Sequence, residues 1–79
     1  MLHLKRTAEK LFVLINTNLD PKYDSECNMI MDVFLEEDFT LDELKRLLSY
    51  LLEKVKEDRK EEVQMKIERE VGLLEDAQK

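Results

Sequence analysis

The sequence predicts an all-α protein, a small helical bundle in a single domain spanning residues 1–79. Three observations predict this fold class. The chain has one glycine and one proline in 79 residues, too few for the many tight turns of a β protein. Apolar residues recur at intervals of three and four over long stretches, as on one face of an α-helix. One cysteine cannot form an internal disulfide, so packed helices must supply the stability of so short a chain.

The first helix is expected over residues 2–19. Its apolar residues share a stripe about 100° wide, the width of a helix face that packs on a core. They are Leu4, Ala8, Leu11, Phe12, Ile15 and Leu19. Proline disfavours helical geometry at the preceding residue and has no backbone N–H, so Asp20-Pro21 ends this helix.

The second helix is expected over residues 25–37, with Asp24 or Ser25 as its cap. Its apolar residues cover more than half of its circumference and leave one narrow polar strip, made of Ser25, Asn28, Asp32 and Glu36. A helix with so wide an apolar arc needs more than one neighbour to cover it.

The third helix begins with a capping-box pattern, Thr40 followed three residues later by Glu43. Residues 41–55 carry one leucine-rich stripe, and a second stripe, rotated by about 100°, contains Val63, Ile67, Val71 and Leu74. Residues 56–62 are all charged and contain no helix breaker. We therefore favour one continuous helix over residues 41–75, so that the bundle has three helices. A break near residues 57–61 would give a fourth helix.

The length of this third helix predicts self-association. At 1.5 Å per residue it would be about 52 Å long, whereas a compact chain of this size has a radius of gyration of about 12 Å. The second stripe would then lie in water, and a homodimer is the simplest way to cover it. The apolar surface expected to contact a second copy or a partner consists of Met31, Leu35, Val63, Ile67, Val71 and Leu74.

The net charge of −6 is concentrated in one segment. Residues 23–44 contain eight acidic residues and no lysine or arginine, while residues 1–22 sum to +2 and residues 45–79 sum to zero. This balance argues against direct binding of nucleic acid or of an anionic membrane, which require clustered basic residues. A protein partner with a basic surface is the natural complement.

The most unusual part of the segment is the run Glu36, Glu37 and Asp38, because acids at a helix C-terminus oppose the helix dipole. One interpretation is internal pairing with the basic start of the first helix, at His3, Lys5 and Arg6. A second is an acidic docking patch for a basic partner, formed by Asp32 and these three acids. Adjacent carboxylates are only a weak signal for a divalent metal.

The sequence contains no catalytic constellation, and we expect no catalytic, cofactor or metal site. Cys27 and His3 are expected at opposite ends of a hairpin, so Cys27 is best explained as a core or interface residue. No apolar run is long enough to cross a membrane. The expected function is that of a small acidic cytoplasmic interaction protein, non-catalytic and dimeric: an adaptor, a sequestering regulator or a dedicated chaperone. The alternative is a nucleic-acid-mimicking inhibitor that blocks the basic groove of a DNA- or RNA-binding protein.

Overall fold

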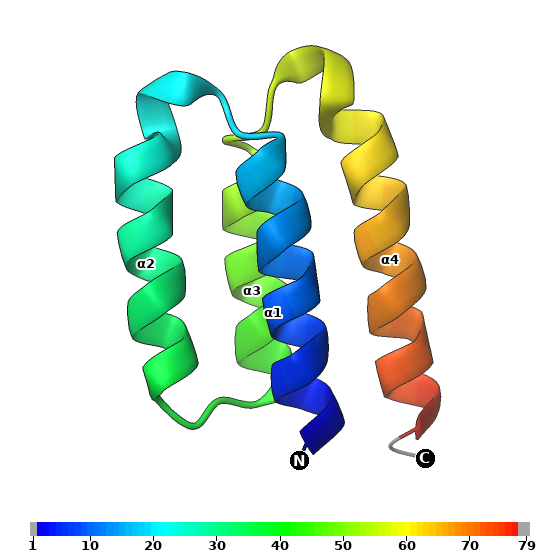
Figure 1. The fold of residues 1–79 in the computed structure, drawn as a ribbon. Coiled ribbons are helices and arrows are strands. Elements are labelled where there is room, and N and C mark those ends of the chain that lie inside the picture. Colours follow the sequence, from blue (N-terminus) through cyan, green and yellow to red (C-terminus); the bar gives the residue numbers. More distant parts are fainter. Residues whose placement is uncertain (1, 78–79) are drawn as a thin grey trace.

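The computed structural model describes residues 2–77, which form four α-helices and no strand. The helices are α1 (Leu2–Thr17), α2 (Asp24–Glu36), α3 (Leu41–Leu52) and α4 (Lys60–Ala77). Two short 3-10 helices, η1 (Pro21–Tyr23) and η2 (Glu57–Arg59), precede α2 and α4. The predicted all-α bundle is therefore confirmed, with four helices (Figure 1). No helix in the described range combines the length and apolar content needed to cross a membrane.

The helix ends predicted from the proline and from the capping box lie within two residues of those in the structure. Pro21 lies in the first turn of η1, after α1 has ended at Thr17. At the start of α3 the capping box is complete: the Thr40 backbone N–H donates to Glu43 Oε1 at 2.9 Å, and the Glu43 backbone N–H donates to Thr40 Oγ1 at 3.2 Å. These reciprocal bonds use backbone donors that the first turn cannot satisfy.

The prediction of a continuous third helix is wrong, and the alternative of a break is correct. α3 ends at Leu52, and Val55 turns into the core and forms an isolated antiparallel bridge with Leu19. The Asp20 N–H donates to the Lys54 carbonyl at 3.0 Å, and the Lys56 N–H donates to the Asn18 carbonyl at 2.9 Å. Closing this second hairpin buries the apolar stripe of α4, and each buried side chain contributes about 1.5–3 kcal/mol. That gain outweighs the helical preference of the charged run.

α1 is the central element of the bundle. It packs against α2, α3 and α4, and α4 also packs against α3. Figure 1 shows α1 in front of α3, with α2 on one side of this pair and α4 on the other. The α1–α2 and α3–α4 turns lie together at one end, and the α2–α3 loop lies at the opposite end. The Cα radius of gyration is 12.0 Å.

The structure corrects the predicted apolar surface. Met31, Val63, Ile67, Val71 and Leu74 are all buried in the core of the chain itself, and Leu35 is half-buried against that core. The break after α3 is the reason, because it lets α4 fold back onto α1 and α3. The argument for a homodimer from an uncovered stripe on a long helix therefore no longer applies.

The turns of the two hairpins, α1–α2 and α3–α4, follow the same register, with equivalent positions 36 residues apart. The Asn18 N–H donates to the Ile15 carbonyl and the Lys54 N–H to the Leu51 carbonyl, both at 2.9 Å. The bonds from Tyr23 to Asp20 and from Arg59 to Lys56 repeat in the same way, again both at 2.9 Å. η1 and α2 begin at residues 21 and 24, and η2 and α4 begin at 57 and 60. The Leu19–Val55 bridge joins two equivalent positions, so the two turn regions are related by an approximate two-fold axis.

Candidate interaction surface

The outward face of α2 carries two exposed apolar side chains. Met29 is 69% exposed and Val33, one turn later, is 53% exposed. Cys27 and Met31 point the other way and are buried. Residues three and four apart are neighbours on a helix surface, so exposed acids border this pair. We call the exposed set Glu26, Met29, Asp32, Val33 and Glu36 the α2 surface.

The predicted acidic patch lies on this surface and at its C-terminal end. Asp32 and Glu36 belong to the α2 surface, and Glu37 and Asp38 follow directly after the helix. All four residues are exposed. The structure therefore places two of the predicted acids on one helix face with Met29 and Val33, and the other two at the end of that helix.

The acids at the end of α2 do lie beside the start of α1, as the hairpin interpretation requires. Leu4 and Lys5 of α1 line a groove together with residues 35–39. Among the described residues, however, no ion pair within 4.0 Å joins Glu36, Glu37 or Asp38 to the basic start of α1. The predicted proximity is present without the predicted pairing.

The ion pairs of the described chain all involve η2 or α4. Lys10 Nζ lies 2.8 Å from Glu70 Oε1, and Lys45 Nζ lies 2.9 Å from Glu75 Oε1. The other pairs are Arg59–Glu62, Glu57–Lys60 and Glu62–Lys66. In the described structure every paired acid belongs to η2 or α4, and no acid of residues 23–44 is in an ion pair.

A groove between α1 and α2 runs along the edge of the α2 surface, with a volume of about 370 Å³. Phe12, the exposed Val13 and Asn16 line it from α1, and Asp32 and Leu35 line it from α2. Asp32 thus belongs both to the groove and to the α2 surface. The exposed apolar side chain of Val13 therefore lies on the same groove as Asp32.

Sequence reasoning missed Met29, Val33 and Val13 as surface residues. A usable signal was present for Met29, because at 100° per residue it lies only about 20° beyond Glu36, at the edge of the predicted polar strip. Val13 lies outside the apolar stripe of α1 by the same construction. Counting the apolar residues of α2 as one wide arc concealed the fact that some of them belong to the polar side.

The remaining reactive side chain of this region is Cys27. Its side chain is fully buried, and burial, followed by the nearby charge of Glu26, raises the pKa of the thiol above its ordinary value of 9.0. A thiol with a raised pKa is a poor nucleophile at neutral pH. Within residues 2–77, no three His, Cys, Asp or Glu side chains are grouped closely enough to hold a metal ion.

Comparisons with known proteins give no relative: no family model matches the chain, and neither a curated protein nor a solved structure is significantly similar to it.

Proposed function

We propose that this protein is a small non-catalytic interaction module that binds a basic protein partner through the α2 surface. The observation that carries the proposal is the exposure of Met29 and Val33 between acids that form no ion pair in the described structure. Scattered exposed apolar residues are common, but adjacent ones bordered by charges of a single sign are typical of a binding surface. A single buried thiol suits a reducing compartment, so we place the activity in the cytoplasm.

The two kinds of residue would have different roles in binding. Burial of Met29 and Val33 against a partner contributes affinity, up to about 1.5–3 kcal/mol for each side chain if it is fully buried. The acids contribute mainly to the rate of association and to partner choice, because charge complementarity steers the encounter. A helix with an apolar stripe flanked by lysine or arginine would fit such a surface.

The nucleic-acid-mimicking inhibitor has less support. Mimicry of a phosphate backbone requires carboxylates in a regular exposed row. On α2 the exposed row is interrupted by Met29 and Val33, which have no counterpart in a phosphate backbone.

The test is affinity capture with the full chain, followed by titration of the purified captured protein. Met29→Ser should weaken binding about tenfold, the equivalent of about 1.4 kcal/mol. Met65→Ser is the matched control, because Met65 occupies the equivalent position on α4 and is 65% exposed. The control should change affinity less than twofold, by about 0.4 kcal/mol at most. Equal losses in both variants would refute a binding site on α2.

A second pair of variants tests the charges. Reversal of Asp32 and Glu36 to lysine should slow association and reduce its salt dependence, because the steering field is lost. Glu68→Lys, at the position on α4 equivalent to Asp32, is the control. An association rate that the Asp32 and Glu36 reversals leave unchanged would remove the acids from the proposal.

A further inference from the structure

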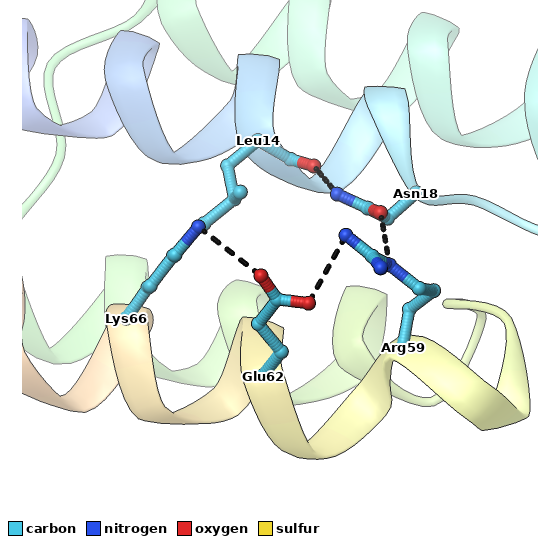
Figure 2. Close-up of polar contacts among 5 residues, drawn as sticks. All are labelled: Leu14, Asn18, Arg59, Glu62 and Lys66. Atoms are coloured by element: carbon cyan, nitrogen blue, oxygen red, sulfur yellow. Dashed lines mark hydrogen bonds and ion pairs between the residues drawn. The ribbon is translucent and has the colours of Figure 1, made fainter.

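The turn end of the bundle has two equivalent corners, one where α4 meets α1 and one where α2 meets α3. Figure 2 shows the first. The Asn18 side chain donates to the Leu14 carbonyl at 2.8 Å, and Arg59 Nε donates to Asn18 Oδ1 at 3.0 Å. Arg59 also pairs with Glu62 at 3.0 Å, and Glu62 lies 3.5 Å from Lys66 Nζ. The hydrogen bond from Arg59 to Asn18 therefore ties η2 to the residue that follows α1, and the ion pairs of Glu62 extend this network along α4.

The second corner uses the equivalent positions, shifted by the 36-residue register. Tyr50 and Lys54 correspond to Leu14 and Asn18, and Tyr23 and Glu26 correspond to Arg59 and Glu62. The ammonium of Lys54 lies 4.9 Å from the ring centroid of Tyr23 and 4.9 Å from that of Tyr50. The Tyr50 hydroxyl donates to Glu26 Oε1 at 3.3 Å. Two cation–π contacts and one hydrogen bond thus take the place of the network in Figure 2.

The second corner matters more to its helix than the first does. α4 packs along both α1 and α3 and is also held by the Lys10–Glu70 and Lys45–Glu75 ion pairs. α2 packs closely along α1 but not along α3. In the described structure, the bond from Tyr50 to Glu26 is the one hydrogen bond or ion pair that joins α2 to α3.

We propose that Lys54 is a positioning residue that pins α2 against α3 through Tyr23 and Tyr50. Tyr23 precedes α2 directly, so holding its ring fixes the start of the helix. Lys54 lies just beyond α3, and its own carbonyl accepts the bridge hydrogen bond from Asp20, which places its backbone firmly. Lys54 is half-buried, and its ammonium between two rings supplies attraction that an uncharged side chain of equal length would lack. The contact of Lys54 with these two rings is a property of the free protein. Only its effect on the presentation of the α2 surface rests on the proposed function.

Amide hydrogen exchange on the free, full-length protein tests whether Lys54 holds α2 against α3. Each cation–π contact is worth about 0.5–1 kcal/mol, so Lys54→Met should accelerate exchange of the α2 amides about tenfold, with the α4 amides within about twofold of wild type. Arg59→Met should leave the α2 amides within about twofold of wild type and should accelerate the α4 amides by less than about tenfold, because packing on two helices and two further ion pairs also hold α4. Lys22→Met is the matched control: Lys22 lies 5.1 Å from the Tyr23 ring but within the same 3-10 helix, so it links nothing to α3.

Two results would overturn the proposal. In the first, the α2 amides of Lys54→Met exchange at rates within about twofold of those in Lys22→Met. In the second, Lys54→Met accelerates exchange equally in α2 and α4, which is the pattern of global destabilisation. Lys54→Arg keeps the charge and should restore protection of α2. If Lys54→Arg exchanges as fast as Lys54→Met, the charge is not what holds the helix, and the inference fails.

Discussion

Neutralising the acids at the end of α2 should stabilise the free protein. The change is Glu36→Gln, Glu37→Gln and Asp38→Asn. The last carbonyl groups of a helix carry partial negative charge, and an acid in the last turn costs about 0.3–1 kcal/mol. Glu36 lies in that turn and the other two follow directly after it, without an ion pair in the described structure. Relief of the unfavourable contacts should raise the free energy of unfolding by about 1 kcal/mol.

Thermal unfolding followed by circular dichroism measures this gain. For a domain of this size, 1 kcal/mol corresponds to a Tm change of about 4–8 °C. The increase should be seen near 10 mM salt, where the Debye length is about 30 Å, and should shrink toward 1 M, where it is about 3 Å. A gain that does not respond to salt would have another cause, such as an altered helix propensity.

The matched control lies across the α2–α3 loop, at the start of α3. Asp42 is also exposed and acidic, but it lies in the first turn of its helix, where a negative charge is favourable. Asp42→Asn should therefore lower Tm, which is the opposite sign. If the triple variant is instead less stable than wild type, the acids pair with Lys5 or Arg6 in solution, and our interpretation of them as partner-facing is refuted.

Two further predictions follow from burial. Leu48 is 2% exposed, so Leu48→Ala should lower the free energy of unfolding, measured in urea, by about 2–5 kcal/mol. Leu73 is 59% exposed, so Leu73→Ala should change that free energy by about 0.5 kcal/mol at most. Similar losses in both variants would show that the core is misplaced. Burial raises the pKa of the Cys27 thiol, so the unfolded state ionises first, and stability should fall as the pH rises through about 9. The Cys27→Val variant has the residue found at the equivalent buried position, Val63. Its free energy of unfolding, measured by urea titration, should fall less over that pH range. An unchanged pH slope would contradict the assignment of this pH dependence to Cys27.

Much of the fold could be predicted because its signals are local. The stripe of α1, the proline after it and the Thr40–Glu43 capping box each depend on neighbours within a few residues. The end of α3 does not depend on nearby residues alone. Residues 53–59 favour helix locally, and they leave it because Val55 meets Leu19, a contact between residues 36 positions apart in the sequence. The rotation between the two apolar stripes was the available signal, since two stripes on different faces suit two helices.

The candidate site was predictable in its charges but not in its pairing. The position of Asp32 and Glu36 on the polar side of α2 follows from helical periodicity alone. Whether an acid finds a base depends on how the helices pack. Lys10, on α1, pairs with Glu70, 60 residues away in the sequence. Periodicity within one helix carries no information about such a contact.

The Leu19–Val55 bridge also bears on how the chain is assembled during its synthesis. Contacts within each hairpin are local and form early, whereas the bridge has to wait for the second hairpin. The ribosome makes a chain from its N-terminus, so the acids of α2 are complete before Val55 and Lys54 exist. Until then α1 and α2 expose apolar faces that α3 and α4 later cover. We expect the uncompensated negative charge of these acids to keep the incomplete chain soluble and to protect it from aggregation, in addition to the partner binding that we propose for the finished protein.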